Sequence, residues 1–458
     1  TEDTIAAIAT AIAAGQGGIA IVRISGPKAL TVGKSIVSVP KGTIWRSHTV
    51  LYGHVMNEQN NEHIDEVLIL TMQGPRSFTG EDVVEIHCHG GLIAVQRVLE
   101  RVLRHPQARR AMPGEFCQRA VLNGRMALTQ AEAISELIGA RSRQAAQLAM
   151  AGIDGGIQQR INTLRETLLD QLSELEARVD FEDELPPLDG THILNELMKV
   201  QSELQQLLDD AKRGAFLRQG LRVALIGCPN VGKSSLLNRL SRRERAIVTD
   251  IPGTTRDVLE SEIILEGIPI TLLDTAGIRT TNDEIEKLGI SKSQQTMMGA
   301  DIVLMLYDLS QGWTEDDDAL LTQIPKEIPT LVVGNKADVQ NELIFSKQTI
   351  KIAAFETAIT FSALTGEGEE SLIHSLLKIC GANDTQGLQI ALNERQRDLA
   401  AKAAAALNKT KEAANQELPW DFWTIDLREA IHNLGELTGH EITEALLDRI
   451  FSRFCIGK

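Results

Sequence analysis

The chain contains few cysteines, and their positions exclude two kinds of scaffold. Five occur in 458 residues, namely Cys88, Cys117, Cys228, Cys380 and Cys455. Their number is odd and their spacing matches no metal motif, so neither a disulfide framework nor a structural zinc site is indicated. Cysteine usage of this kind is typical of a reducing compartment, and we expect the protein to be cytoplasmic.

Long hydrophobic runs are also lacking. The apolar stretch from Ile5 to Val22 is rich in alanine and is interrupted by Gly15-Gln16-Gly17-Gly18. A membrane helix needs about 20 consecutive apolar residues, so we expect two short core elements here and no association with a membrane. No secretory signal is recognisable at the start of the sequence.

Positive charge is the third feature in short supply. The chain carries 46 basic and 62 acidic residues, which gives a formal net charge of −16. A protein that wraps nucleic acid over a wide surface is normally basic, so any contact with RNA must be made by a local patch. The length of 458 residues predicts about three domains.

The most informative feature that is present is a phosphate-binding loop. Residues 227–234 read Gly-Cys-Pro-Asn-Val-Gly-Lys-Ser and match G-x-x-x-x-G-K-[ST]. An apolar run of strand type, 221–226, precedes them, and a helix-compatible run, 234–243, follows. This order aims backbone N–H groups and the positive end of the helix dipole at one point. We expect Lys233 to reach the terminal phosphates and the Ser234 hydroxyl to ligate Mg²⁺.

A second motif, Asp274-Thr275-Ala276-Gly277, follows the apolar run 268–273. A carboxylate at a strand end can hold a metal ion through water. The glycine after it leaves a backbone N–H free to approach the γ-phosphate. We therefore expect this motif to face the phosphate-binding loop.

A third motif, Asn335-Lys336-Ala337-Asp338, ends the apolar run 330–334. Asp338 can accept two hydrogen bonds from the N1–H and 2-amino edge of guanine, which adenine does not offer, and such a site rejects the wrong base by about 10⁴. Ser362-Ala363 ends a further short strand, and its backbone N–H could reach the guanine oxygen. Each motif alone fits a polar turn after a buried strand. Their order favours a guanine-nucleotide domain, a mostly parallel sheet with helices on both faces.

The catalytic residues of this domain are less clear. In Ras-like proteins a Gln directly after the Asp-x-x-Gly motif orients the attacking water, and here that position is Ile278. Either the domain hydrolyses GTP poorly or the water is held from elsewhere. The polar candidates are Arg256, Arg279, Asp283, Glu284 and Glu286. Asn230 offers a side-chain oxygen near the phosphates, where a monovalent cation could bind, although Asn also commonly caps a turn.

The segments on either side of the nucleotide domain differ from it and from each other. Before it, strands are expected at 18–24, 50–55, 67–72 and 83–88 and a helix at 92–103, which indicates a separate α/β or α+β domain. Within it, His87 and His89 share one strand face, but no third ligand is apparent, so we expect a satisfied histidine pair.

Helical patterns follow this domain and recur after the nucleotide domain. One apolar stripe comprises Leu164, Leu168, Leu172 and Leu175, and another comprises Ile193, Leu197, Val200, Leu204 and Leu207. Residues 181–190 connect them, and further helices are expected at 393–415, 427–437 and 441–451. We expect one bundle with the nucleotide domain inserted into it, and part of a stripe could equally form a dimer face.

Further motifs resemble the MnmE (TrmE) family of tRNA modification GTPases over essentially the whole chain. The nucleotide motifs and the run from Ala246 to Asp257 match, but nucleotide motifs are shared by many GTPases. The more specific matches are the terminal Phe-Cys-Ile-Gly-Lys, residues 454–458, the run Ser-Phe-Thr-Gly-Glu-Asp at 77–82, and His-Gly-Gly at 89–91.

The resemblance implies a multidomain α/β and α fold. Its parts would be an α+β folate-binding-like dimerisation domain at 1–118, a discontinuous helical bundle at 119–216 and 383–458, and an inserted Ras-like P-loop GTPase domain at 217–382. Members are homodimers. With a flavin-dependent partner, MnmG (GidA), they build an aminomethyl-type group on C5 of the wobble uridine of tRNAs, using a tetrahydrofolate derivative. Their GTP hydrolysis uses Mg²⁺ and depends on K⁺, which promotes pairing of two nucleotide domains.

The resemblance also implies roles for single residues at the nucleotide site. K⁺ would be held by Asn230, Thr249, Ile251 and Thr254, and Mg²⁺ by Ser234 and Thr255, while Glu286 would position the water. A fixed cation can stand in for a missing arginine. The residues expected to contact GTP are Gly227, Asn230, Val231, Gly232, Lys233, Ser234, Ser235, Thr249, Asp250, Ile251, Pro252, Gly253, Thr254, Thr255, Asp274, Thr275, Ala276, Gly277, Asn335, Lys336, Asp338, Ser362 and Ala363.

The folate contacts of the family fall on Arg23, Glu81, Arg125 and Lys458. Arg125 stands where some members carry Lys, which keeps the charge and alters the geometry. Without the family, Arg23 and Glu81 would be ordinary surface or strand-end charges. Cys455 either serves thiol chemistry or is simply a free cysteine in the tail.

Two other functions fit parts of the sequence. A ribosome-assembly or RNA-chaperone GTPase would carry an RNA-binding module, and we find no G-x-x-G loop of the KH type in a basic setting. A non-catalytic nucleotide switch is suggested by Ile278. Folate retention by the amino-terminal domain would distinguish a modification GTPase from a ribosome-assembly or RNA-chaperone GTPase. K⁺-dependent GTP turnover would distinguish it from a non-catalytic switch.

Overall fold

The computed structural model describes most of the chain and divides it into two compact units. The described residues are 3–12, 17–60, 62–180, 189–242, 259–274, 297–339, 358–382, 385, 387–441 and 443–457. The first unit comprises Thr1–Ser135, Gly152–Asp189 and Glu412–Lys458, and the second comprises Glu136–Ala151 and Gly190–Lys411. The four-part division expected from the sequence is a different one and stays a prediction.

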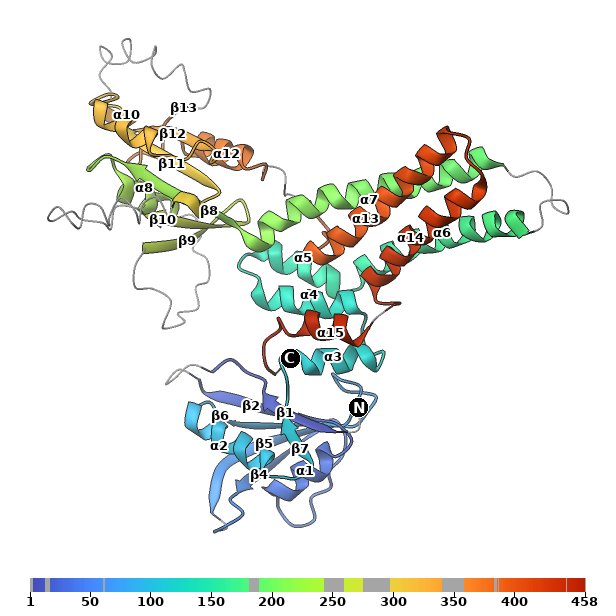
Figure 1. The fold of residues 1–458 in the computed structure, drawn as a ribbon. Coiled ribbons are helices and arrows are strands. Elements are labelled where there is room, and N and C mark those ends of the chain that lie inside the picture. The colour runs from blue at the N-terminus through green and yellow to red at the C-terminus, as the bar shows by residue number, and fades with distance from the viewer. Residues whose placement is uncertain are drawn as a thin grey trace. The chain divides into compact units, whose positions relative to one another are not determined.

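The first unit contains a seven-stranded sheet of order β3-β4-β5-β6-β2-β1-β7 (Figure 1). The strands are β1 (Thr4–Ile8), β2 (Ile19–Ser25), β3 (Val37–Ser38), β4 (Thr49–Met56), β5 (His63–Met72), β6 (Val83–His89) and β7 (Ala108–Arg110). The four strands and the helix predicted from the sequence are confirmed. The apolar amino-terminal stretch forms β1 and β2 as two core strands, because glycine breaks it between them.

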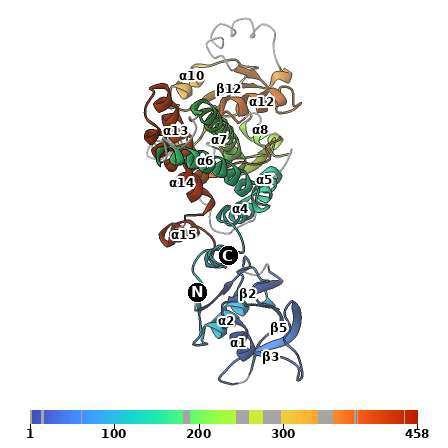
Figure 2. The ribbon, with the colours of Figure 1, turned by 90° about the vertical axis from the view of Figure 1, so that its right-hand side faces the viewer.

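Two helices cover one face of this sheet. They are α1 (Ala29–Ile36) and α2 (Leu92–Leu103), which contact each other and the strands (Figures 1 and 2). Val32 and Ile36 of α1 and Val95, Val98 and Val102 of α2 are buried in one core with the inward-facing strand residues. The apolar residues of both helices recur at helical spacing, which explains why each presents a single face to the sheet.

The helices of the first unit pack in two groups. Helix α14 (Trp420–Thr438) packs on α6 (Gly156–Asp180), and the predicted Leu164–Leu175 stripe of α6 is buried. Helix α15 (Glu444–Phe451) packs on α3 (Glu115–Leu122). Phe451 and Phe454 share a core there with Cys117 and with Leu128 of α4 (Leu128–Gly139).

The second unit contains a six-stranded sheet of order β13-β12-β11-β8-β10-β9. The strands are β8 (Leu221–Gly227), β9 (Leu259–Leu265), β10 (Ile268–Asp274), β11 (Ile302–Asp308), β12 (Thr330–Asn335) and β13 (Ala358–Thr360). All neighbours are parallel except β9 and β10, which are antiparallel. Three of these strands were expected from apolar runs and confirm the prediction of a mostly parallel sheet.

Both faces of this sheet are covered, as expected. In β8, Val223 and Leu225 belong to a core shared with α8 (Lys233–Leu240) and α12 (Glu369–Ile379). The alternate residues, Ala224 and Ile226, belong to a second core that includes residues of α10 (Glu315–Thr322). Alternation of this kind places successive side chains on opposite faces, and it explains why the strand is largely apolar apart from the exposed Arg222.

Three further helices belong wholly or largely to the second unit: α5 (Arg143–Ile153), α7 (Gly190–Gln219) and α13 (Glu394–Asn415). The stripe predicted from Ile193 to Leu207 is buried along α7. Leu217 at the end of α7 and Leu148 of α5 join the core beneath the sheet. Within the described ranges, no helix is both long and apolar enough to cross a membrane.

Candidate functional site

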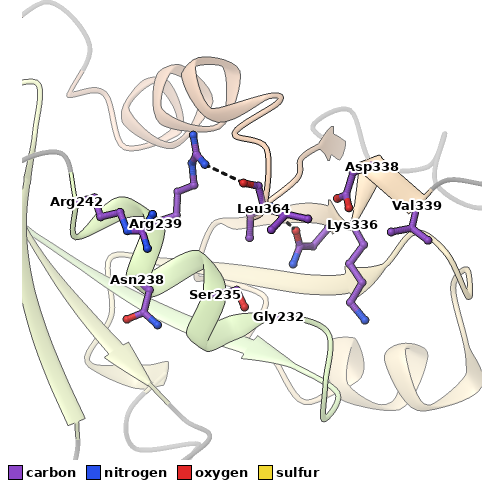
Figure 3. Close-up of a pocket in the computed structure, with 11 residues that line it drawn as sticks. Gly232, Ser235, Asn238, Arg239, Arg242, Lys336, Asp338, Val339 and Leu364 are labelled. Atoms are coloured by element: carbon purple, nitrogen blue, oxygen red, sulfur yellow. Dashed lines mark hydrogen bonds between the residues drawn. The ribbon is translucent and has the colours of Figure 1, made fainter.

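The carboxyl ends of three parallel strands carry the motifs found in the sequence. Strand β8 ends at Gly227, β12 at Asn335 and β13 at Thr360. Because parallel strands end at the same edge of a sheet, the loops that follow them lie together, which is where ligands bind in open α/β sheets. Figure 3 shows side chains from these loops and from α8 around one cavity.

The phosphate-binding loop runs from the end of β8 into α8, as predicted. Gly232 adopts a φ of 99°, and a Cβ there would lie 2.2 Å from Nδ2 of Asn335. Only glycine meets both conditions. Lys233 donates from Nζ to the carbonyl oxygens of Gly227, at 2.5 Å, and Cys228, at 3.0 Å. Ser234 is exposed on the first turn of the helix, where backbone N–H groups can bind an anion.

Asn335 joins the three loops. Its Nδ2 donates to the carbonyl oxygen of Val231 at 2.8 Å, and its Oδ1 accepts from the backbone N–H of Ala363 at 3.0 Å. The side chain is fully enclosed, with 2% exposed. A buried amide whose donor and acceptor are both used fixes the spacing of the loops that it connects.

Asp338 and Lys336 extend from the same turn. Asp338 is exposed, and its Oδ1 accepts a hydrogen bond of 2.5 Å from the hydroxyl of buried Ser362. Lys336 pairs through Nζ with Oδ2 of Asp308 at 2.6 Å. Burial would raise the pKa of Asp308, but hydrogen bonds from Lys336 and Ser310 outweigh it and hold the pKa below its ordinary value. Asp308 therefore stays ionised and anchors the lysine.

The cavity between these loops and α8 has a volume of about 420 Å³. Its lining residues are Gly232, Ser235, Asn238, Arg239, Arg242, Asn335, Lys336, Asp338, Val339, Ala363 and Leu364. Asp338, Lys336 and Leu364 line the side formed by the loops after β12 and β13, and Asn238 and Arg242 line the α8 side (Figure 3). Arg239 pairs with Glu369 at 2.8 Å and donates to the carbonyl oxygen of Leu364 at 3.2 Å. A cavity with a carboxylate at one end and a phosphate-binding turn at the other suits a nucleotide.

Several residues that the sequence predicted to contact GTP lie outside the described residues. They are Thr249, Asp250, Ile251, Pro252, Gly253, Thr254, Thr255, Thr275, Ala276, Gly277 and Glu286, together with the other candidates Arg256, Arg279, Asp283 and Glu284. Asp274 is the last residue of β10, and its backbone is in register with Leu225 of β8. It therefore sits at the same strand edge as the phosphate-binding loop.

Cys228 lies within the phosphate-binding loop, and its thiol is partly buried. Burial raises the pKa of its thiol to about 11, and the neighbouring Asp317 carboxylate acts in the same direction. The thiolate is the reactive form of cysteine. This residue therefore packs beneath the loop as a neutral group.

Three of the predicted folate residues meet around one loop of the first unit. The Arg23 guanidinium lies 5.2 Å from the ring centroid of Phe78, and Arg125 donates from Nε to the carbonyl oxygen of Ser77 at 3.3 Å. Glu81 is four residues further along this loop. Ser25 donates to its Oε2 at 2.7 Å. A carboxylate and two guanidinium groups around one loop fit a ligand with paired N–H groups and an anionic tail.

Arg119 is a residue of this region that the sequence did not single out. It is 1% exposed and pairs with Glu81 at 3.2 Å, with Asp3 at 2.9 Å and with Glu115 at 2.9 Å. The arginine holds the Glu81 carboxylate from below. The sequence around α3 does not indicate Glu81 as a partner of Arg119. The one available signal was the presence of a charged residue at a position of the helix that faces the core.

The carboxyl-terminal tail returns to the sheet of the first unit. The backbone N–H of Gly114 donates to the carbonyl oxygen of Cys455 at 3.3 Å. A Cβ at Gly457 would lie 2.2 Å from the carbonyl oxygen of Ile8. Ile8 is next to Ala7, which pairs with Arg23 across β1 and β2. The side chain of Cys455 is exposed, and Lys458 lies outside the described residues.

The histidine pair of β6 has partners other than metal. His89 pairs through Nδ1 with Asp65 at 2.6 Å, and this hydrogen bond raises the pKa of the exposed ring. His87 lies 3.6 Å from Glu85. Within the part of the chain that the structure describes, no group of three or more His, Cys, Asp or Glu side chains could hold a metal ion. The expectation of a satisfied pair holds for His89 only, because the buried Nε2 of His87 has no hydrogen-bond partner among the described residues.

Comparisons with known proteins cover the whole chain. The family described as "GTP-binding protein TrmE N-terminus" matches residues 4–125, and the family described as "MnmE helical domain" matches residues 128–455. The chain is 69% identical to a "tRNA modification GTPase MnmE" of Prochlorococcus marinus (strain MIT 9303), over 100% of this chain and 98% of that protein. It is 64% identical to the protein of that name from Synechococcus sp. (strain CC9605), over 100% of both.

A search of solved structures finds G proteins. A crystal structure of an Aquifex aeolicus Era variant bound to GDP.AlF4- is 26% identical, covers 41% of this chain and 66% of that chain, and gives a TM-score of 0.30.

Proposed function

The chain belongs to the MnmE family of tRNA modification GTPases, and on that premise we propose that it couples K⁺-stimulated GTP hydrolysis to modification of the wobble uridine of tRNAs. In this proposal it acts as a cytoplasmic homodimer with a flavin-dependent partner, MnmG (GidA). The product is an aminomethyl-type group on C5 of the uridine, and its one-carbon unit comes from a tetrahydrofolate derivative.

The observation that supports GTP as the nucleotide is the arrangement of Asn335, Asp338 and Ser362. Asn335 fixes the base-recognition turn against the phosphate-binding loop, and Ser362 orients the Asp338 carboxylate. A fixed, ionised carboxylate accepts the N1–H and 2-amino groups of guanine. Adenine would leave it without a partner at a desolvated site, and that penalty is the basis of selectivity.

The phosphates would lie on the turn between β8 and α8. In the structure, Lys233 donates to two carbonyl oxygens of the loop. When a nucleotide binds, hydrogen bonds to phosphate oxygens would replace these two bonds. The oxygen donors of Ser234 and Asn230 are both exposed at this turn, and Asn230 has a φ of 67°. Hard oxygen donors of this kind fit Mg²⁺ and an alkali ion. We assign Ser234 with Thr255 to Mg²⁺, and Asn230 with Thr249, Ile251 and Thr254 to K⁺.

A bound cation beside the phosphates supplies positive charge that stabilises the transition state. The chain's own residues orient the reactants. In our assignment, which follows the family resemblance, Glu286 positions the attacking water. Ile278, at the position where Ras-like proteins carry a Gln, has no polar group for this role.

The one-carbon donor is proposed to bind around the Ser77–Glu81 loop. Glu81 would accept the paired N–H groups of a pterin, and Arg23 and Arg125 would face its acidic tail. The position of Gly457 against Ile8 brings the end of the tail beside β1 and supports a contribution from Lys458. Cys455 is exposed next to the same sheet and is available for thiol chemistry.

Two measurements test this proposal. The first is equilibrium binding of 5-formyltetrahydrofolate to the full-length protein, wild type and Glu81→Gln, with Glu66→Gln on the exposed strand face as the control. The second is the modification of bulk tRNA by the protein with the flavin-dependent partner, GTP and folate, followed by nucleoside mass spectrometry. A folate affinity of Glu81→Gln equal to that of the wild type would reject the folate site. Uridine that stays unmodified with all components present would reject the function.

A further inference from the structure

The hairpin formed by β9 and β10 connects two segments that are proposed to contact the nucleotide. It begins at Leu259, shortly after Thr255, and ends at Asp274, directly before Thr275. The strands are paired without a break, from Leu265 with Ile268 at the turn to Leu259 with Asp274 at the open end. Continuous antiparallel pairing makes such a hairpin a stiff element, so a displacement at one end is transmitted to the other.

The turn of this hairpin is held by the first turn of α5. Gly267 adopts a φ of 84°, and a Cβ there would lie 2.1 Å from the side-chain carbonyl carbon and oxygen of Gln144. The amide of Gln144 therefore occupies the space above the turn. A side chain at position 267 would be strained at this φ and would overlap the Gln144 amide. The contact with Gln144 therefore depends on glycine at position 267.

Arg141 makes a second link to the same hairpin. Its NH1 group pairs with Oε1 of Glu262 on β9 at 3.0 Å, and its NH2 group donates to the carbonyl oxygen of Gln219, the last residue of α7, at 2.5 Å. The guanidinium thus bridges the hairpin and the helix that leads into β8. A planar group with donors at fixed angles sets the distance between its two acceptors.

The helical side of this contact is itself fixed. The Ser142 hydroxyl accepts from the backbone N–H of Ala145 and caps α5 at 3.2 Å. Arg218, beside Gln219, pairs with Glu136 of α4 at 3.5 Å, and burial lowers the pKa of its guanidinium. Leu148 of α5 and the hairpin residues Ile263 and Ile270 belong to one core. Arg141 therefore projects from a packed support.

We infer that Arg141 is a positioning residue for GTP turnover, acting through Glu262 and the β9–β10 hairpin to fix Asp274 at the nucleotide site. Arg141 is not among the residues that line the cavity. It holds the middle of β9 through Glu262, Gln144 holds the turn, and the hairpin holds the strand end where Asp274 stands beside the phosphate-binding loop. The inference rests on the proposed GTP site.

A charge exchange tests this inference. Arg141→Glu, Glu262→Arg and the double variant are made in the full-length protein, and kcat and KM for GTP are measured in potassium chloride. Each single variant is expected to lower kcat by about threefold or more and to leave KM within about twofold, and the double variant is expected to recover most of the lost kcat. The matched control exchanges Lys199 and Glu196, an exposed pair on α7, and should leave kcat unchanged.

Three results would overturn the inference. Single variants with wild-type kcat would remove the role, and so would a double variant no faster than the slower single variant. A loss of kcat that is matched by a parallel loss of GTP affinity and thermal stability would show a purely structural role. Gln144→Ala removes only the amide above Gly267 and should also lower kcat; if the charge variants do not fold, an unchanged kcat in Gln144→Ala refutes the inference. A wild-type chain without GTP turnover would overturn the proposed function and this inference together.

Discussion

The hydroxyl of Ser362 donates a hydrogen bond of 2.5 Å to Oδ1 of Asp338. Ser362 is fully buried, and Asp338 is exposed at the end of the cavity. The serine hydroxyl also accepts from the backbone N–H of Thr365 at 3.1 Å. The hydroxyl proton is therefore directed at the carboxylate, and a residue from one loop orients the group of another loop that is proposed to recognise the base. Under this proposal, base selectivity depends on two loops.

Replacement of Asp338 by Asn should exchange the base preference. The amide oxygen still accepts from the N1–H that both bases carry, but the amide NH2 group opposes the 2-amino group of guanine and can donate to the 2-carbonyl oxygen of xanthine. We expect the preference for GTP over xanthosine triphosphate to fall by about 10³ or more. Competition binding with both nucleotides measures the change, and Asp398→Asn on the exposed face of α13 is the control. An unchanged preference would refute the assignment of Asp338.

Replacement of Gly232 by Ala should weaken nucleotide binding through the turn. The new methyl group would lie too close to Nδ2 of Asn335, and the alanine would have to adopt a φ of 99°. Left-handed backbone costs a non-glycine residue about 1–2 kcal/mol, and the Asn335–Val231 hydrogen bond must also break. We expect GTP affinity to fall by about tenfold or more. Titration with a fluorescent GTP analogue measures it, with Gly381→Ala, where the structure leaves open space, as a control for backbone strain alone. Equal affinity in Gly232→Ala would show that the loop tolerates a side chain there.

Replacement of Glu286 by Ala should separate binding from hydrolysis. If this carboxylate orients the water, its loss leaves GTP affinity unchanged and slows turnover by about 10² or more. Single-turnover hydrolysis and equilibrium binding on the same preparation distinguish the two quantities. Turnover at the wild-type rate would discard the assignment and return attention to Glu284 and Asp283.

Replacement of Asn230 by Ala should remove most of the stimulation by K⁺ and little of the GTP binding. In the proposed site its side-chain oxygen would be the K⁺ ligand within the phosphate-binding loop, whereas backbone groups and Lys233 would bind the phosphates. We expect the ratio of rates in potassium and sodium chloride to fall to near one. A ratio that stays at the wild-type value would show that the ion is held by other groups.

The cysteines should differ in their reaction with a thiol reagent. Burial raises the pKa of Cys88, Cys228 and Cys380 to about 11, whereas Cys455 is exposed. At pH 8 only about one in a thousand of the raised-pKa thiols is ionised, and this fraction grows tenfold with each pH unit up to 11. Iodoacetamide should therefore label Cys455 first at pH 8, and labelling of Cys228 should rise about a hundredfold by pH 10. Peptide mass spectrometry gives both rates, and equal labelling at pH 8 would contradict the burial of Cys228.

The elements that the sequence predicted well are those with strong local signals. The strand at 221–226 is β8, and the apolar runs at 268–273 and 330–334 are β10 and β12. Most residues of these strands face a covered side of the sheet, with Arg222 of β8 as an exposed exception, so the runs are largely apolar. Gly232 and Lys233 of the phosphate-binding motif predicted the turn that leads into α8.

The boundaries and the long-range contacts were less predictable. The helix expected at 234–243 ends at Leu240, where Ser241 takes the C-cap position and its hydroxyl bonds back to Leu237. The helix expected at 427–437 begins at Trp420, because Pro419 can start a helix but not continue one. Arg119, Arg141 and Gln144 were not singled out, since their partners other than Glu115 lie far away in the chain and the local pattern carries no trace of them.

The central claim is that a potassium ion at the phosphate-binding loop replaces the polar groups that this site lacks. The most direct test is steady-state GTP turnover by the wild-type protein in potassium chloride and in sodium chloride at equal ionic strength. The account predicts turnover that is at least about tenfold faster with potassium. Equal, slow turnover in both salts would contradict it and would leave the protein a nucleotide switch without its own alkali-ion catalysis.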